Sequence, residues 1–199
     1  MSQPTPEHIK DIFARSTCFY TKPEVEAAID KMAEAITHEL ADSNPLFLCV
    51  VIGGIVTLGN LLPRLNFPLE VDYIHATRYR NTLHGGEIHW RAEPSCSLAG
   101  RTVVIVDDIL DSGLTLIEII GYCESKQAKK VYSAVLVDKQ KPREPGGLAI
   151  ADFTGLYVED QYVYGYGMDY KGYLRNAAGI YAAPPEREVR EQGRVTEHK

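Results

Sequence analysis

Val103–Leu116 reads VVIVDDILDSGLTL, an apolar run that passes directly into acidic, hydroxyl and glycine residues. The first four side chains are β-branched and apolar, which favours a strand buried on both faces of a sheet. The stretch therefore predicts a strand over 101–106, an acidic turn, and a helix from about Leu114 to Ser125.

The acidic turn combines two features that together indicate a sugar-phosphate site. Asp107, Asp108 and Asp111 lie within five residues, so their charges repel unless a divalent cation or hydroxyl donors compensate. Residues 111–115 open a helix, where unpaired N–H groups and the helix dipole favour a phosphate. We expect the phosphate in this turn, and ribose hydroxyls or a metal on the acids. The alternative is an ordinary strand end whose aspartates only cap the helix.

Apolar runs of strand length alternate with helical segments along the chain. The expected strands cover residues 46–52, 69–76, 101–106, 131–137, 153–158 and 161–166. Besides the helix after the acidic turn, the first forty residues read as helical, with Thr21 as a cap and Pro23 in a first turn, and a short helix is expected over 55–62. This alternation predicts an α/β fold with a mostly parallel sheet, whose ligands gather beyond the carboxyl ends of the strands.

Two segments lack a regular pattern. Residues 78–99 are polar and aperiodic, and a loop of that length in a compact domain is most often functional or mobile. The segment from Pro184 onward is charged and poor in large apolar residues, so we expect a disordered tail.

Composition disfavours several classes of protein. The 199 residues carry a net charge of −6, whereas nucleic-acid binders usually show a basic stripe. No apolar run approaches the length of a membrane span, and the first residues lack the apolar segment of a secretory signal. The four cysteines form no C-x-x-C pair, which indicates free thiols in a reducing cytoplasm. We therefore expect a cytoplasmic protein that binds neither nucleic acid nor membrane.

Residues 103–116 resemble the phosphoribosyl-pyrophosphate-binding motif of the type I phosphoribosyltransferases. Val135–Lys139 (VLVDK) and Gln161–Tyr170 (QYVYGYGMDY), with Arg175 beyond them, resemble the hypoxanthine-guanine branch of that family. The resemblance extends from about Leu46 to Arg175. It implies the type I fold, which is an α/β fold with a mostly parallel twisted sheet flanked by helices and a small hood.

The resemblance also implies how the chain divides. A single domain would cover residues 1–183, with a core over about 24–158 and a hood from about 1–20 and 159–183. Residues 184–199 would form the disordered tail.

The implied reaction is purine salvage. Phosphoribosyl pyrophosphate and a 6-oxopurine (hypoxanthine or guanine) would give IMP or GMP and pyrophosphate, with magnesium (Mg²⁺) as cofactor. Asp107 and Asp108 match the acidic pair that holds the ribose hydroxyls, directly or through the metal; Glu-Asp is the common form of this pair. The phosphate cradle matches Asp111, Ser112, Gly113, Leu114 and Thr115.

The resemblance assigns further roles around the purine. Asp111 also matches the catalytic residue that takes the proton from purine N7, and an ordinary aspartate is ionised at neutral pH. Lys139 matches the lysine that donates to the oxygen on purine C6. Tyr162 matches the ring that stacks on the base, and Val163 offers backbone groups to its edge. Asp169 matches a carboxylate near the purine and a second metal ion, so the implied metal residues are Asp107, Asp108 and Asp169.

The resemblance implies that two parts of the chain bind pyrophosphate and that a third closes over the site. Ile52-Gly53-Gly54 matches the pyrophosphate loop, which often holds a non-proline cis peptide; many relatives carry Lys or Arg in place of Ile52. Arg175 matches an arginine that binds pyrophosphate. Thr77-Arg78-Tyr79 begins the segment that matches a mobile lid, where Ser-Tyr is common in relatives, so Arg78 is a departure.

Alternatives stay open at this stage. A related enzyme that prefers xanthine, or accepts all three 6-oxopurines, would differ around Gln161 and Asp169. A non-catalytic regulator on the same fold would sense nucleotides and bind RNA or DNA, against which the acidic charge argues. An enzyme for adenine, orotate or uracil is disfavoured by Lys139. The family also implies a homodimer or homotetramer whose interface lies near the Gly53 loop and the following helix.

Overall fold

The main sheet is the frame of the molecule. The computed structural model describes residues 3–78 and 88–185 and contains a six-stranded sheet in the order β4-β3-β2-β5-β6-β7. All neighbouring strands pair in parallel except β4, which runs antiparallel to β3. The strands are β2 Leu46–Val50, β3 Glu70–Arg78, β4 Ile88–Ala92, β5 Thr102–Leu110, β6 Lys130–Gln140 and β7 Phe153–Glu159.

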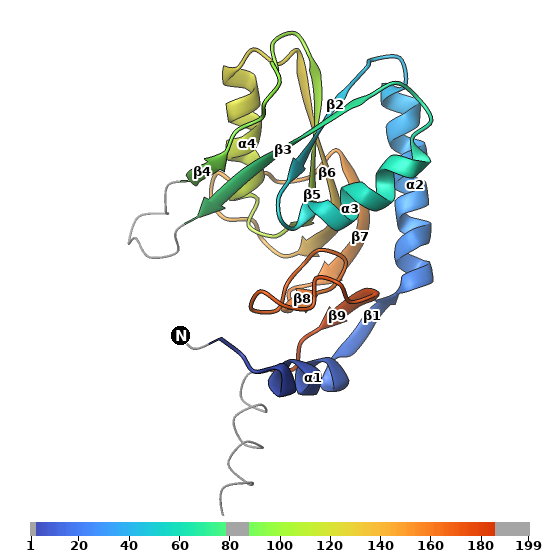
Figure 1. Ribbon diagram of the computed structural model, residues 1–199, viewed down its shortest axis with the longest axis vertical. Helices are drawn as coiled ribbons and strands as arrows, with labels where there is room; N and C mark the ends of the chain where they lie inside the picture. The colour runs from blue at the N-terminus through green and yellow to red at the C-terminus, as the bar shows by residue number, and fades with distance from the viewer. Residues whose placement is uncertain (1–2, 79–87, 186–199) are drawn as a thin grey trace, which may run out of the picture.

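Helices cover both faces of this sheet (Figure 1). The helices α2 (Lys22–Leu40) and α3 (Gly54–Leu61) lie on one face, and α3 runs into a short 3₁₀ turn over Leu62–Arg64. The helix α4 (Leu114–Ser125) packs on the other face. Each face has its own buried cluster, one around α2 and α3 and one around α4. The predicted α/β fold with a mostly parallel sheet is confirmed.

The central strands are buried because they are apolar on both sides. All five residues of β2 are buried, and so are Thr102–Val106 in β5. Both strands lie between two parallel neighbours and under helices on both faces, which is the environment that continuous apolar runs require. The predictions of strands over 46–52 and 101–106 are thus confirmed in type, although β2 ends at Val50 and β5 extends to Leu110.

The start of α2 follows from its sequence. The Glu24 carboxylate accepts hydrogen bonds from the backbone N–H and the hydroxyl of Thr21, and Pro23 lies in the first turn. This capping box satisfies donors that the helix itself leaves unpaired. The expected cap at Thr21 is confirmed.

A second, three-stranded antiparallel sheet forms a hood beyond the carboxyl ends of the main strands (Figure 1). Its order is β1-β9-β8, and the helix α1 (Pro6–Arg15) packs beside it. Its strands are β1 Thr17–Thr21, β8 Val163–Tyr164 and β9 Gly179–Ala182. The prediction that the first forty residues are helical is wrong at β1. Its β-branched and aromatic residues (TCFYT) suit a strand once β9 offers a partner, from the far end of the chain.

Other boundaries also differ from the sequence expectation. Residues 88–92 form the edge strand β4 inside the expected loop over 78–99, because β3 offers them an antiparallel partner. The strand β5 runs through Asp107 and Asp108 to Leu110, because its pairing with β6 continues that far. Of the expected strand over 161–166 only β8 forms, because the chain bends at Gly165 (φ 104°).

Two expectations lie wholly or partly outside the described residues. Nearly all of the tail expected over 184–199 belongs to them, as does most of the expected lid. Within the described ranges, no helix combines the length and apolar character that crossing a bilayer requires.

Replacing Ile36 by alanine should lower the free energy of unfolding by about 2–5 kcal/mol, because the side chain is fully buried between α2 and the sheet. Glu34→Ala, on the exposed face of the same helix, should change it by less than about 0.5 kcal/mol. Urea unfolding followed by circular dichroism measures both. Equal losses would contradict the placement of Ile36 in the core.

Candidate active site

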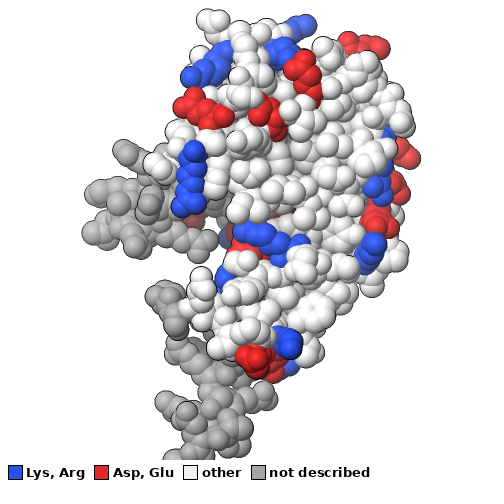
Figure 2. All heavy atoms as spheres, viewed as in Figure 1, with Lys and Arg blue, Asp and Glu red and all other residues white. Residues whose placement is uncertain are grey.

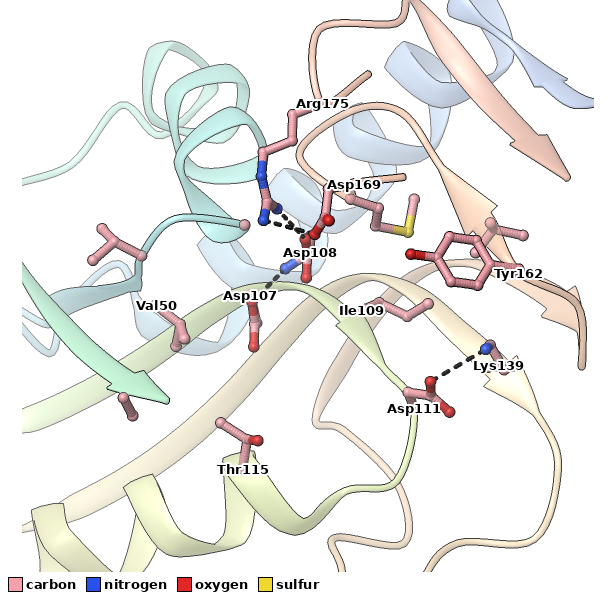
Figure 3. Close-up of a pocket in the computed structure, with 15 residues that line it drawn as sticks. Val50, Asp107, Asp108, Ile109, Asp111, Thr115, Lys139, Tyr162, Asp169 and Arg175 are labelled. Atoms are coloured by element: carbon pink, nitrogen blue, oxygen red, sulfur yellow. Dashed lines mark hydrogen bonds and ion pairs between the residues drawn. The ribbon is translucent and has the colours of Figure 1, made fainter. Parts of the chain in front are cut away.

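A cleft of about 510 Å³ lies between the carboxyl edge of the main sheet and the hood. Figure 2 shows acidic and basic side chains inside the hollow between the main body and the hood. Figure 3 shows how the cleft draws side chains from both parts. Its lining includes the predicted site residues Gly53, Asp107, Asp108, Asp111, Thr115, Lys139, Tyr162, Val163, Asp169 and Arg175.

The acidic pair stands near the end of β5. The backbone N–H of Asp108 donates to the Asp107 carboxylate at 2.8 Å, and Asp108 is buried. Burial raises the pKa of Asp107, and the neighbouring charge of Asp108 raises it further. Burial also raises the pKa of Asp108, although its hydrogen bonding to Asp107 and the charge of Arg175 oppose that rise. Both carboxyls are therefore costly to ionise without a cation.

Arg175 joins this pair to the hood (Figure 3). Its guanidinium lies 2.7 Å from a carboxylate oxygen of Asp169 and 3.8 Å from one of Asp108, and it donates to the carbonyl of Gly167. The other carboxylate oxygen of Asp169 accepts from the N–H of Gly172 at 2.7 Å. The structure thus brings together the predicted pyrophosphate arginine and two of the three predicted metal residues.

Asp111 is held by two lysines. Lys139 Nζ lies 3.2 Å from Asp111 Oδ2, and Lys141 Nζ lies 2.5 Å from Asp111 Oδ1. Burial works to raise the pKa of Asp111, but the hydrogen bonds and charges of Lys141 and Lys139 outweigh it, so the pKa is lowered. The carboxylate is therefore ionised at neutral pH. Sequence reasoning named Lys139 and missed Lys141, whose position two residues further on was its only signal.

The turn after β5 has the open shape that an anion site needs. Residues Asp111, Ser112, Gly113 and Thr115 line a second hollow of about 420 Å³, which also contacts the acidic pair. Gly113 has φ of 80° at the start of α4, and a Cβ there would lie 2.4 Å from the carbonyl of Leu148. Only glycine fits that backbone without strain. Leu114, also named from the sequence, is the first residue of α4.

Arg143 stabilises this turn through hydrogen bonds to its backbone, a role that the sequence did not reveal. Its guanidinium donates to the carbonyls of Leu110, Asp111 and Lys139 at 2.7–3.3 Å. It also pairs at 2.5 Å with the buried carboxylate of Asp138. One side chain therefore connects the carboxyl ends of β5 and β6, which fixes the turn against the neighbouring strand.

The predicted pyrophosphate loop follows β2 directly. The peptide bond Val51–Ile52 is cis, which matches the expectation for this loop. A Cβ on Gly53 would lie 2.2 Å from a carboxylate oxygen of Asp108, and one on Gly54 would lie 2.5 Å from the carbonyl of Val106. Both glycines therefore let the loop approach β5 closely. The side chain of Ile52 is 55% exposed and is absent from the cleft lining.

An aromatic wall closes the opposite side of the cleft. The ring of Tyr162 is half exposed and meets the ring of Tyr170 edge-on, with centroids 5.6 Å apart. The Tyr162 carbonyl accepts from the N–H of Ala183 at 2.8 Å, and Val163 pairs with Ala182 in β9. The sheet of the hood thus fixes the backbone that presents the ring. Figure 3 places Tyr162 on the same side of the cleft as Asp111 and Lys139.

The structure says less about the predicted lid residues and the predicted metal site. The backbone of Arg78 ends β3, and Tyr79 lies outside the described residues. Among residues 3–78 and 88–185, no three His, Cys, Asp or Glu side chains gather as a protein-only metal site. A Mg²⁺ ion that keeps its waters and takes oxygens from a substrate phosphate needs fewer protein ligands.

Comparison with known proteins agrees with this geometry. Residues 17–147 match the family described as "Phosphoribosyl transferase domain". The hypoxanthine-guanine phosphoribosyltransferase of Bacillus subtilis is 31% identical over 166 residues, which are 83% of this chain and 91% of that protein. The chain belongs to the hypoxanthine-guanine phosphoribosyltransferase family.

Two further family members are similar. The hypoxanthine-guanine-xanthine phosphoribosyltransferase of Tritrichomonas foetus is 30% identical over 157 residues, which are 79% of this chain and 85% of that protein. A solved hypoxanthine phosphoribosyltransferase from Staphylococcus aureus superposes with a TM-score of 0.80 at 23% identity, over 86% of this chain and 92% of that one. The latter match confirms the type I fold.

Gly113→Ala should lower the free energy of unfolding by more than about 1 kcal/mol, because alanine is strained at φ 80° and its methyl group meets Leu148. Gly121→Ala is the matched control in the same helix. It has open space around it and should raise stability by about 0.4–1 kcal/mol. Urea unfolding compares the two, and a neutral Gly113→Ala would contradict the described turn.

Proposed function

We propose that this protein transfers 5-phosphoribosyl from phosphoribosyl pyrophosphate to hypoxanthine or guanine, giving IMP or GMP and pyrophosphate. Family membership supports this reaction, since relatives with 30–31% identity along most of their length are named for it. The observation that carries the proposal is the pairing of Asp111 with Lys139 at 3.2 Å in a cleft that also holds the acidic pair. A proton acceptor and an ammonium donor side by side suit the N7 and C6-oxygen edge of a 6-oxopurine.

Asp107 and Asp108 are the proposed partners of the ribose hydroxyls and of Mg²⁺, with Asp169 near a second ion. Their fit rests on donor chemistry, because carboxylate oxygens are the ligands that Mg²⁺ prefers. The raised pKa values of the buried Asp108 and the half-buried Asp107 also favour a cationic ligand. When bound, Mg²⁺ would neutralise the charge that develops on the pyrophosphate leaving group.

The other groups of the cleft receive roles from their positions. In our proposal residues 111–115 hold the 5-phosphate, since their N–H groups open α4. The Gly53–Gly54 backbone and Arg175 bind pyrophosphate, and Ile52 adds no charge there. Arg175 must then exchange part of its contact with Asp169 and Asp108 for the phosphate oxygens.

For the base, we assign stacking to Tyr162 and backbone recognition to Val163. The half-exposed ring of Tyr162 is an available flat surface at the cleft. Lys139 donates to the oxygen on purine C6 and so selects 6-oxopurines over adenine. Asp111 takes the proton from N7, for which its lowered pKa keeps it ionised.

We also propose that the protein forms a homodimer or homotetramer. Ile52 and Ile55 are large apolar side chains that are half exposed near the Gly53 loop, and Val71 and Tyr73 of β3 are exposed to a similar extent. Val71 and Tyr73 pair in register with Phe47 and Cys49, which face α3, so they share the face of the sheet that carries that helix. Size-exclusion chromatography with light scattering tests this part.

We also propose that the protein is cytoplasmic and that residues 1–183 form a single domain. All four cysteines are free thiols, which is typical of a reducing compartment.

The test of the function is a spectrophotometric assay with Mg²⁺ and phosphoribosyl pyrophosphate, in which hypoxanthine, guanine, xanthine and adenine are supplied separately. Nucleotide should form with hypoxanthine and guanine and not with adenine. A dominant xanthine rate would favour the broader specificity named for the T. foetus relative. No nucleotide with any base would reject the enzyme and favour a regulator.

Asp111→Asn should keep substrate binding and lower turnover by about 10²- to 10⁴-fold, because an amide cannot accept the N7 proton. Steady-state kinetics with hypoxanthine measures kcat, and isothermal calorimetry measures phosphoribosyl pyrophosphate binding. Asp42→Asn, at the opposite end of the sheet, is the control and should leave both unchanged. Unchanged turnover in Asp111→Asn would remove Asp111 from its proposed role.

A further inference from the structure

Lys139 and Lys141 converge on the same pair of carboxylates. The backbone N–H of Lys141 donates to the carbonyl of Lys139 at 2.9 Å, a tight turn at the end of β6. The two ammonium groups contact opposite oxygens of Asp111 at 3.2 and 2.5 Å. Both also lie 3.7 Å from the same oxygen of Asp160. Two cations and two anions thus form one compact, balanced cluster at the cleft.

The two lysines differ in how they are held. The Lys139 side chain is 10% exposed and lines the cleft, whereas that of Lys141 is 28% exposed and is absent from the lining. Lys139 is therefore the lysine that reaches a ligand, and Lys141 contacts Asp111 from outside the cleft. Their roles cannot be the same.

Lys139 faces two demands in the proposed reaction. Its ammonium pairs with Asp111, yet it must donate to the oxygen on purine C6. If Lys139 were the only cation here, turning to the base would cost the carboxylate of Asp111 its hydrogen bond from that lysine. Lys141 offers that carboxylate a second partner, because its ammonium lies 2.5 Å from the other oxygen of Asp111.

Resting on the proposed function, we infer that Lys141 is a positioning residue: it holds Asp111 and Asp160 so that Lys139 is free to bind the purine. Lys141 itself touches no substrate.

The electrostatics of the pair agree with this assignment. A hydrogen bond to Asp111 raises the pKa of Lys141, although burial opposes the rise. The same contact is the strongest of those that lower the pKa of Asp111. The partnership of Lys141 and Asp111 therefore favours the charged form of both side chains.

Lys141→Gln should raise KM for hypoxanthine about tenfold, the order expected when Lys139 must give up its charge-assisted hydrogen bond with Asp111 to bind the base. Among the described residues, Lys139 then becomes the only cation within ion-pair distance of both carboxylates and must leave them to bind the base. KM for phosphoribosyl pyrophosphate should stay unchanged, and so should the melting temperature. Lys141→Arg keeps the charge and should stay within about threefold of the wild type. Lys129→Gln, exposed before the start of β6, is the matched control.

A double-mutant cycle with Asp111→Asn tests whether Lys141 acts through Asp111. In that background the closer partner of Lys139 is already gone and only its 3.7 Å contact with Asp160 remains, so adding Lys141→Gln should change KM for hypoxanthine by less than about twofold. A full tenfold change in that background, or an equal rise in both KM values, would overturn the inference. Failure of the proposed function is separate, because the wild type would then form no nucleotide with any purine.

Discussion

The cleft depends on the point at which β2 ends. The strand β5 pairs with β2 only as far as Val106 with Cys49, whereas its pairing with β6 continues to Leu110 with Asp138. Asp107 and Asp108 therefore stand on a strand that keeps one neighbour and has lost the other. The chain after β2 turns through Gly53 into the space that β2 leaves free beside β5. Because Gly53 has no side chain, its backbone can contact Asp108. Acidic side chains thus lie against a backbone loop at the edge of a dry core, which is where oriented dipoles and bound cations act most strongly.

Much of the fold could be predicted from the sequence because the strongest sequence patterns are local. The continuous apolar runs of β2 and β5 and the capping box of α2 each depend on residues within one element. The strands β1, β4 and β9 depend instead on pairing with other strands of the chain. The hydrophobic pattern of their own residues is therefore a weak indication of a strand. The short strand β8 ends at Gly165, whose positive φ angle no periodicity reveals.

Part of the site could be predicted for the same reason, because its residues are close together in the sequence. Residues 107–115 are contiguous, and the chemistry of aspartate, serine and glycine at a helix start is legible in a linear sequence. Arg143 and Lys141 were missed because each acts on groups that another strand supplies. A lysine or arginine just after a strand usually faces solvent, and nothing in KQKPRE states that two of these side chains turn inward. Ile52 brings no charge to the loop, and its exposed apolar side chain is absent from the cleft lining.

The hood pairs the two ends of the described chain, since Thr17 of β1 lies opposite Ala182 of β9. The same late region supplies the aromatic wall and Arg175. During synthesis on a ribosome, the sheet and the phosphate turn therefore emerge well before the segment that completes the cleft. A partly made chain has the acidic edge of the site without its other half, so the complete cleft can form only after the late segment has been made. The order of the residues along the chain thus delays activity until the sheet that supports it has already been made.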